Sequence, residues 1–279
     1  MSIIYTYILG DVWEVVMLEH FDHWLFRFFV FWYGCGLILL TFDILPPSLE
    51  WANAVFLVLT GVLGAVFLIR QYGVSIGLVL SFLIVIITFL IEGAGVHYGI
   101  LFGDYYYNPD FGLILFEVPF TIGAAWLMVI STTHVIARAF SFRVPNKMLE
   151  WFVYTIVGSV AAVIMDIVLD PVAFQVKEYW VWTAGGFYYD IPLSNFVGWF
   201  VLAFILHTVV FLTLLLTKRW TGFVHRYWQP RMVWLYIMVL VMFLVLAVTH
   251  GLWLAVGISL LLSIILFIGY FKWKENPTL

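Results

Sequence analysis

The chain has 279 residues, of which 65% are hydrophobic, 20% aromatic and only 10% charged, and its formal net charge is −4. The mean hydropathy of +1.09 excludes a soluble globular domain, because too few polar residues remain to cover the surface of one. The single cysteine, Cys35, excludes an internal disulfide framework. We therefore predict an integral membrane protein, folded as one transmembrane helical domain over residues 1–279.

Stretches of about 20 apolar residues are long enough to cross a hydrocarbon core about 30 Å thick. We predict eight such helices, at residues 24–45, 51–70, 74–94, 117–137, 149–170, 191–217, 231–249 and 251–271. The last two share a long uncharged run, which is interrupted at His250-Gly251 and reads as a tight helical hairpin. The predicted fold class is an all-α, polytopic membrane helix bundle.

The basic residues indicate how this bundle is oriented. Cytoplasmic loops of membrane proteins are enriched in Lys and Arg. Eleven of the twelve basic residues fall on one side of the eight-helix arrangement, and Lys177 alone falls on the other. The eleven are Arg27, Arg70, Arg138, Arg143, Lys147, Lys218, Arg219, Arg226, Arg231, Lys272 and Lys274. We therefore expect a multi-pass protein of the cell membrane with both termini in the cytoplasm.

Two aspartates end the predicted helix 149–170. Asp166 and Asp170 are four residues apart, so their side chains point the same way, about 6 Å from one another. A charged side chain in hydrocarbon costs on the order of 2.5–3.5 kcal/mol on insertion scales, so the pair indicates a functional site. Two carboxyls this close resist ionising together, which places a proton donor beside a base.

Other polar groups reach the same level of the membrane. At about 1.5 Å per residue, Glu92 lies roughly 33 Å along its helix from Arg70, near the outer boundary. Glu117 opens the fourth predicted helix, and Asn195 lies early in the sixth, both on the outer side. The two outer connections, 95–116 and 171–190, add further candidates for substrate or cation binding. These candidates are His97, Tyr105, Tyr106, Tyr107, Trp180, Trp182, Tyr188 and Tyr189.

The remaining polar groups fit structural roles better. His134 and His207 lie deeper on the cytoplasmic side, where we expect them to make helix contacts. The segment Glu19-His20-Phe21-Asp22-His23 resembles a ligand cluster, but it lies on the opposite side and reads as a polar lead-in to the first helix. No nucleotide-binding or zinc-protease motif occurs, and seven scattered histidines do not form the histidine boxes of a di-iron oxygenase. We predict no cofactor, no metal and no nucleic-acid partner.

Several blocks of residues stand out between positions 75 and 200. They are Glu92-Gly-Ala-Gly-Val-His97-Tyr-Gly99, Phe102-Gly-Asp-Tyr-Tyr-Tyr107, Glu117-Val-Pro119, Asp166-Ile-Val-Leu-Asp170-Pro-Val-Ala173, Trp180-Val-Trp182 and Gly186-Phe-Tyr-Tyr-Asp-Ile-Pro-Leu-Ser-Asn195. Together these blocks resemble a family of carotenoid-biosynthesis membrane proteins. Members of the family include carotenoid 1,2-hydratases that act on gamma-carotene-type and bisanhydrobacterioruberin-type substrates. The chain departs from the pattern at Leu101, where the family has Pro, and at His97, where it has a small polar residue. These departures bear on substrate choice.

The resemblance implies addition of water to the terminal C1=C2 double bond of an acyclic carotenoid, which gives a tertiary alcohol. Protonation of such an alkene needs a desolvated acid, and the cation that follows needs electron-rich faces around it. Our hypothesis assigns Asp166 as the proton donor, with Asp170 tuning it or activating water. Glu92 is the alternative acid, and Asn195 or a tyrosine holds the water. The substrate is lycopene-like, and its chain length stays open.

Three other functions use the same residues differently. A carotenoid cyclase would protonate the same bond and exclude water. A prenyltransferase would bind magnesium and diphosphate through Asp-x-x-x-Asp, but it usually needs two acidic motifs and a cytoplasmic site. A transporter or proton channel would show polar residues through the full depth of the bundle, and the inner half has few. The oligomeric state is open.

Overall fold

The computed structural model describes residues 2–109, 112–221 and 224–274. The chain divides into two compact units, Met1–Pro47 and Ser48–Leu279. The first unit is one long helix, α1 (Ser2–Thr41), whose apolar part covers Met17–Thr41. His23 in this helix contacts the backbone carbonyl of Glu19 one turn earlier, which fits a polar helical segment. Whether the whole chain is one domain stays a prediction.

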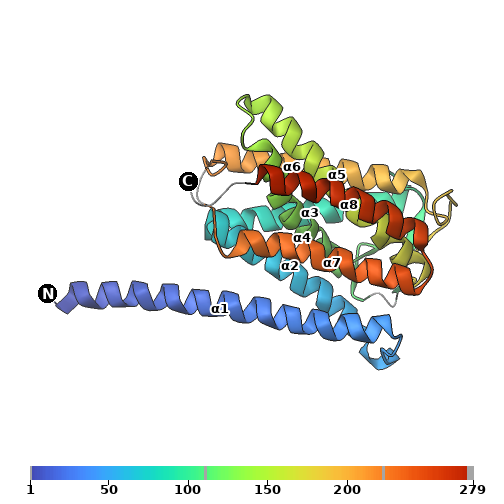
Figure 1. The fold of residues 1–279 in the computed structure, drawn as a ribbon, viewed down its shortest axis with the longest axis horizontal. Helices are drawn as coiled ribbons and strands as arrows, with labels where there is room; N and C mark the ends of the chain where they lie inside the picture. The colour runs from blue at the N-terminus through green and yellow to red at the C-terminus, as the bar shows by residue number, and fades with distance from the viewer. Residues whose placement is uncertain (1, 110–111, 222–223, 275–279) are drawn as a thin grey trace. The chain divides into compact units, whose positions relative to one another are not determined.

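The second unit is a bundle of seven helices (Figure 1). The helices are α2 (Trp51–Tyr72), α3 (Val74–Tyr98), α4 (Phe120–Ser141), α5 (Lys147–Gln175), α6 (Leu193–Leu216), α7 (Trp228–Thr249) and α8 (Trp253–Trp273), and a 3-10 turn (Pro47–Leu49) precedes α2. Together with α1, eight helices of the described residues are long and apolar enough to cross a membrane. The predicted all-α membrane bundle and its helix count are confirmed.

Helix α4 forms the centre of the bundle, and α2, α3, α5 and α7 pack around it. Glycines on α2 allow one of these close contacts: a Cβ added at Gly61 would lie 2.8 Å from Ala124 on α4, and one added at Gly64 would lie 2.8 Å from the Ser131 hydroxyl. Small residues at such contacts are typical of membrane helices, which pack without a hydrophobic driving force between them.

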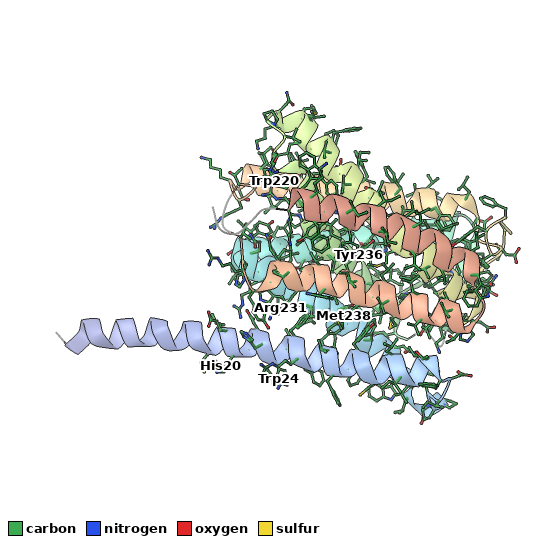
Figure 2. The ribbon with its side chains drawn as sticks, viewed as in Figure 1. His20, Trp24, Trp220, Arg231, Tyr236 and Met238 are labelled. Atoms are coloured by element: carbon green, nitrogen blue, oxygen red, sulfur yellow. The ribbon has the colours of Figure 1, made fainter. Side chains whose placement is uncertain are left out.

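Buried polar side chains on the helices bond to backbone groups of their neighbours. Tyr236 on α7 lies inside the bundle (Figure 2), where its hydroxyl donates to the carbonyl oxygen of Ala161 on α5 at 2.8 Å. Ser259 on α8 donates to the carbonyl of Ile164, also on α5. These bonds fix α7 and α8 against α5, because no water is available in hydrocarbon to replace them.

Two short antiparallel sheets lie at one end of the bundle. Strand β1 (Tyr105–Tyr107) pairs with β4 (Trp180–Trp182), so the long connection between α3 and α4 is joined to the one between α5 and α6. Strand β2 (Ile114–Leu115) pairs with β3 (Val118–Pro119) immediately before α4. Strands β1, β2 and β4 lie in the predicted connections 95–116 and 171–190, and β3 lies at the start of the predicted helix 117–137. Runs of two or three residues carry no alternation from which a strand can be predicted.

The prediction that Glu117 opens the fourth helix is wrong. Phe116 and Glu117 have φ angles of 51° and 65°, and they form the two-residue turn of the β2–β3 hairpin. Two consecutive positive φ angles match the turn type that such hairpins favour. Helix α4 starts only at Phe120, because Pro119 is extended and disfavours helical backbone at the residue before it.

The fifth helix also differs from its predicted bounds. It ends at Gln175 and not at Asp170, so Pro171 lies inside it. Asp166 and Asp170 therefore occupy the interior of α5, and both are fully buried. Being inside a helix, the two carboxyls keep the one-turn spacing that the sequence predicted.

The contact between α5 and α6 depends on a glycine. A Cβ added at Gly158 would lie 2.4 Å from the imidazole of His207, which is fully buried. We expect Gly158→Ala to lower the free energy of unfolding by about 1–3 kcal/mol, since overpacking must displace this ring. Gly257→Ala is the matched control, because no atom lies within 4 Å of its added Cβ. Thermal unfolding in detergent, followed by tryptophan fluorescence, would reveal the difference, and equal midpoints would contradict the packing described.

Candidate functional site

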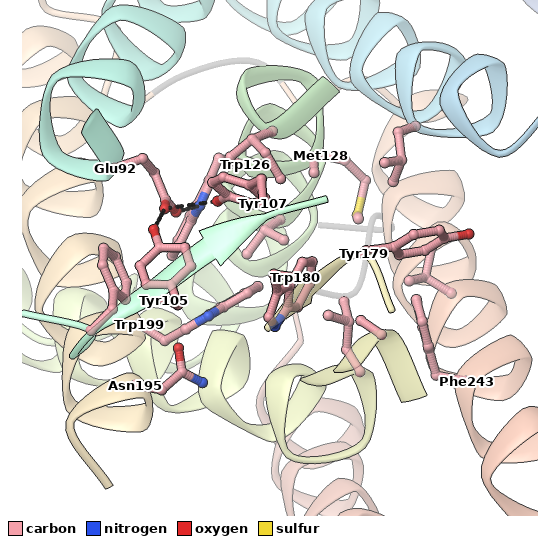
Figure 3. A pocket seen from close by; sticks show the side chains of 18 of the residues that line it. Glu92, Tyr105, Tyr107, Trp126, Met128, Tyr179, Trp180, Asn195, Trp199 and Phe243 are labelled. Atoms are coloured by element: carbon pink, nitrogen blue, oxygen red, sulfur yellow. Dashed lines mark hydrogen bonds between the residues drawn. The ribbon is translucent and has the colours of Figure 1, made fainter. Parts of the chain in front are cut away.

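An aromatic pocket lies under the β1–β4 sheet. Its volume is about 90 Å³, and its lining comes from α2, α3, α4, α5, α6 and α7 as well as from both strands. Figure 3 shows Glu92 and Trp126 on one side of the pocket and Tyr179 and Phe243 on the other. The lining residues are Phe56, Leu57, Glu92, Phe102, Tyr105, Tyr107, Ile122, Ala125, Trp126, Met128, Val129, Leu169, Ala173, Tyr179, Trp180, Trp182, Asn195, Trp199, Val239 and Phe243.

The two strands bring four aromatic rings to the pocket. In the pairing, Tyr105 faces Trp182 and Tyr107 faces Trp180. Side chains alternate along a strand, so residues 105 and 107 share one face and Tyr106 takes the other. Tyr105 and Tyr107 are accordingly buried, whereas 52% of Tyr106 is exposed. The rings of Tyr105 and Trp182 are 4.9 Å apart, and those of Tyr107 and Trp180 are 6.2 Å apart.

Glu92 is the only carboxyl group among the residues that line the pocket. Its Oε2 accepts hydrogen bonds from the hydroxyls of Tyr105 (2.7 Å) and Tyr107 (3.1 Å), and its Oε1 accepts one from Trp126 Nε1 (2.9 Å). No described Lys, Arg or His pairs with it. The acid is thus surrounded by neutral donors, which come from α4 and β1.

The two tyrosines act as donors over a wide pH range. Burial, reinforced by the neighbouring Glu92 carboxyl, raises the pKa of the Tyr105 phenol well above its usual value. The same causes raise the pKa of the Tyr107 phenol. Both hydroxyls therefore keep their protons at physiological pH and continue to donate to Glu92.

Asp166 and Asp170 lie behind the pocket lining and do not reach the pocket themselves. Asn195 on α6 joins them: its Nδ2 donates to Asp166 Oδ2 at 2.9 Å and to Asp170 Oδ2 at 2.7 Å. Asp170 Oδ1 accepts from Trp180 Nε1 at 2.6 Å and from Trp182 Nε1 at 3.4 Å. Asp166 Oδ1 is buried without a hydrogen-bond partner in the described part of the chain.

Tyr188 supplies the hydrogen bond that Pro171 removes from α5. Pro171 has no N–H, so the carbonyl of Ile167, four residues earlier, loses its helical partner. The Tyr188 hydroxyl donates to this carbonyl at 2.7 Å. The bond ties the connection between α5 and α6 to α5, at a point between the two aspartates. Tyr188 is absent from the pocket lining, so its contact is a structural one.

Three other candidates lie away from the pocket. His97 and Glu117 form an exposed pair, with Nδ1 and Oε2 3.4 Å apart and 61% of each side chain accessible. The hydroxyl of Tyr189 accepts hydrogen bonds from the backbone N–H groups of Leu254 and Ala255. Tyr189 therefore caps the N-terminus of α8, where the first N–H groups have no helical partner.

Sequence reasoning missed several lining residues, Trp126 and Phe102 above all. Trp126 donates to Glu92, and its ring lies 4.5 Å from that of Trp199. The sequence does indicate a role for Trp126, since a tryptophan inside a buried helix needs a partner for its indole N–H. Phe102 has a subtler signal: the added Cβ atoms of Gly95 and Gly198 would lie 2.9 and 2.5 Å from its ring, so two glycines make room for it.

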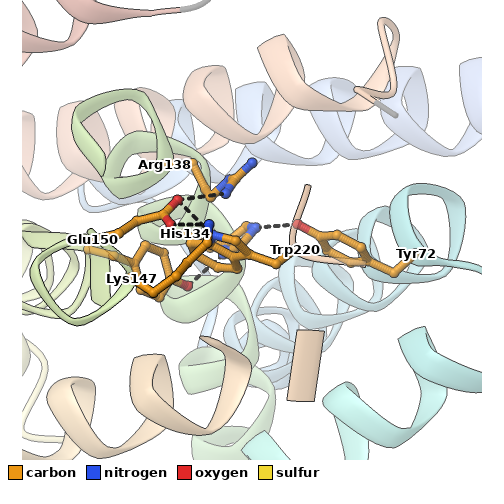
Figure 4. A network of polar contacts seen from close by, with 7 residues as sticks. Tyr72, His134, Arg138, Lys147, Glu150 and Trp220 are labelled. Carbon is orange, nitrogen blue, oxygen red and sulfur yellow. Dashed lines mark hydrogen bonds and ion pairs between the residues drawn. The ribbon is translucent and has the colours of Figure 1, made fainter. Parts of the chain in front are cut away.

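A second polar cluster lies further along α4 (Figure 4). His134 bonds to the hydroxyls of Tyr72 and Tyr154, at 2.6 Å each, and so links α2, α4 and α5. His207 contacts the Thr133 hydroxyl, which agrees with the predicted helix-contact role of both histidines. Glu150 accepts from Trp220 and pairs with Lys147 and with Arg138, whose guanidinium lies over the Trp220 ring.

A family model described as "Carotenoid biosynthesis protein" matches residues 52–266. The match extends well beyond the blocks at 75–200 and includes every residue of the pocket lining. No curated protein and no solved structure matches the chain. Among the described residues, no group of three or more His, Cys, Asp or Glu side chains is arranged to hold a metal ion.

The Tyr188 bond can be tested with a double-mutant cycle. Tyr188→Phe leaves the Ile167 carbonyl buried without a donor, which costs about 1–3 kcal/mol. In a Pro171→Ala background, position 171 regains an N–H for this carbonyl, and we expect the loss to fall below about 0.5 kcal/mol. Unfolding in mixed detergent and SDS micelles measures both values. An equal loss in the two backgrounds would show that Tyr188 does not compensate for the proline.

Proposed function

The chain belongs to the carotenoid biosynthesis protein family, and we propose that it is a carotenoid hydratase. It adds water across the terminal C1=C2 bond of an acyclic carotenoid end group and gives a 1-hydroxy carotenoid. The reaction needs acid–base chemistry and no cofactor. Membership of the family gives the chain a role in carotenoid biosynthesis, and the pocket supplies the argument for hydration.

One observation carries the proposal: a lone carboxyl group, Glu92, lines a pocket that is otherwise aromatic or apolar except for Asn195. An isolated alkene has no heteroatom to polarise, so the reaction must begin with proton transfer from a desolvated acid. The tertiary cation that forms needs π faces close by. Tyr105, Tyr107, Trp126, Trp180, Trp182 and Trp199 all line the same pocket as the acid.

The proposed reaction proceeds in two steps. The O–H bond of protonated Glu92 breaks and the C2–H bond forms, which leaves the positive charge at C1. The O–C1 bond then forms to water, and the proton that water loses returns to the Glu92 carboxylate. Hydrogen bonds from Trp126, Tyr105 and Tyr107 stabilise the carboxylate between these steps. The balance is one water added, without oxidation or reduction.

The geometry favours Glu92 over Asp166 as the proton donor. Glu92 lines the pocket, whereas Asp166 and Asp170 are fully buried and do not. A general acid must come within hydrogen-bond reach of the atom it protonates. The hypothesis that Asp166 donates directly to substrate would require a change in the wall formed by Asn195 and Trp180.

The membrane setting suits a lipophilic substrate. The polyene lies in the bilayer, and only its end group enters the pocket beneath the β1–β4 sheet. With both termini in the cytoplasm, as the basic residues predict, this pocket lies near the extracytoplasmic boundary of the cell membrane. The exposed surfaces of α3 and α8, which carry Leu90, Phe82, Ile264 and Ile268, are apolar enough to face lipid.

Expression in a host that accumulates lycopene tests the reaction type. We expect pigment extracts to contain products heavier by one or two waters, because hydration adds a water at each end group that reacts. Mass spectrometry separates the alternatives. An unchanged mass with altered retention would indicate a cyclase, and an added prenyl mass would indicate prenyl transfer. Either result would reject the hydratase proposal.

Substitution of the acids tests which of them donates the proton. Glu92→Gln keeps the size of the side chain but removes the acid, and we expect hydration to fall about 10²–10⁴-fold. Asp166→Asn retains an oxygen that can accept from Asn195, so the expected loss is less than about tenfold. Glu178→Gln, at an exposed loop residue, is the control. The assay is product formation in membranes with equal protein content. If Asp166→Asn abolished hydration and Glu92→Gln did not, the donor would be Asp166.

A further inference from the structure

Asn195 is held between two acids in a way that restricts its amide to one orientation. Both hydrogens of its NH2 group are used, one for Asp166 Oδ2 and one for Asp170 Oδ2. In the reverse orientation the amide oxygen would face two carboxyl oxygens, which repel it. The side chain is 2% exposed and lies in the first turn of α6, so it has little other freedom.

The carbonyl oxygen of this amide is directed into the pocket. A carboxamide is planar, so its oxygen points away from the side on which its NH2 group is bound. Asn195 lines the pocket, and Figure 3 shows its oxygen on the pocket side. No described residue donates a hydrogen bond to this oxygen. Around it, the indole and phenol groups direct their N–H and O–H bonds to Glu92 and Asp170. The oxygen is therefore an acceptor that none of these indole and phenol groups uses.

The two aspartates are themselves fixed in place. Trp180 and Trp182 hold Asp170 from the β4 strand, and α5 keeps Asp166 one turn away. Neither aspartate pairs with a described Lys, Arg or His, and neither lines the pocket. Their shared partner is the Asn195 amide. The buried acid pair therefore affects the pocket through the orientation of that amide.

We propose that Asp166 and Asp170 are positioning residues that fix the Asn195 carbonyl in the pocket, where it holds the attacking water. The proposal rests on the hydratase function above. Water donates one hydrogen bond to the Asn195 oxygen, which directs an oxygen lone pair toward the cation at C1. After the O–C1 bond forms, the proton released goes to Glu92, since an amide is too weak a base to keep it. Asn195 thereby decides whether the cation is captured by water.

Deuterium exchange separates protonation from hydration. In D2O, protonation at C2 places a deuterium there, and a cation that is not captured loses a proton and returns to an alkene. The recovered, unhydrated carotenoid is then heavier by one deuterium. Membranes containing the whole protein are incubated with lycopene in D2O, and mass spectrometry follows both products. A variant that only loses the water acceptor continues to exchange, whereas a misfolded variant loses exchange and hydration together.

Asn195→Leu is the first variant. We expect hydration to fall about 100-fold while deuterium exchange into the recovered substrate continues, because the acid and the aromatic faces remain. Val197→Leu, at a half-exposed position two residues along α6, is the matched control. Unchanged hydration in Asn195→Leu would overturn the proposal, and so would a parallel loss of hydration and exchange in a variant whose unfolding midpoint matches wild type.

An exchange of acid and amide side chains tests the positioning role of the acids. In Asp170→Asn the side-chain oxygen stays with the indole N–H groups of Trp180 and Trp182, so the new NH2 group faces the Asn195 NH2, and Asn195 must turn and present N–H groups to the pocket. We expect exchange without hydration, as in Asn195→Leu. Adding both Asn195→Asp and Asp166→Asn reverses every donor and acceptor of the cluster: the amides at positions 166 and 170 donate to one oxygen at position 195, and its second oxygen faces the pocket. We expect this triple variant to hydrate about tenfold faster than Asp170→Asn alone. No recovery would contradict the positioning role.

The outcomes also distinguish this inference from the proposed function. If wild-type protein neither hydrates nor exchanges deuterium into any acyclic carotenoid, the hydratase proposal itself fails. If wild type hydrates and Asn195→Leu hydrates equally well, the function stands and the water is held elsewhere.

Discussion

The buried acids of this bundle must find all their hydrogen-bond partners within the protein, because hydrocarbon offers none. The structure supplies such partners in two ways, with Asp166 Oδ1 left without one among the described residues. Glu150, in the second polar cluster, is paired with Lys147 and Arg138 as well as Trp220. Glu92 and Asp170, near the pocket, are matched by neutral donors. A cation beside an acid favours its ionised form, whereas neutral donors leave proton exchange open. The contrast separates the ion-paired Glu150 from Glu92, the acid proposed to exchange a proton with substrate.

The neutral donors have a second use. Apart from the Asn195 amide, each is the polar edge of an aromatic ring: the phenols of Tyr105 and Tyr107, and the indoles of Trp126, Trp180 and Trp182. Once the edges are bonded to carboxyl groups, the rings are held in place while they line the pocket. A pocket built this way has its electron-rich surfaces organised before substrate arrives, which is the condition for electrostatic stabilisation of a short-lived cation.

The two long connections, between α3 and α4 and between α5 and α6, are anchored at several points. Strand pairing joins β1 to β4, Tyr188 bonds to the carbonyl that Pro171 leaves free, and Tyr189 caps α8. Each anchor supplies a partner to a backbone group that would otherwise lack one. The aromatic residues of these connections thus fall into two groups, those that shape the pocket and those that hold its cover in position.

The lengths of the membrane-spanning segments and the spacing of Asp166 and Asp170 could be predicted from the sequence, because both follow from helix geometry alone. That Glu92, Asp170 and Asn195 lie at a common level of the bundle could be predicted for the same reason. The sequence could not predict which of these groups faces a pocket, since that depends on how α3, α4, α5 and α6 rotate against one another. Tertiary packing placed Glu92 in the pocket with Trp126, put the aspartates behind it, and turned Tyr106, His97 and Glu117 outward. The sequence by itself determined a membrane bundle with acids near one end. Only the tertiary structure decided which acid the pocket contains, because helix rotation and strand pairing are set by contacts between distant segments.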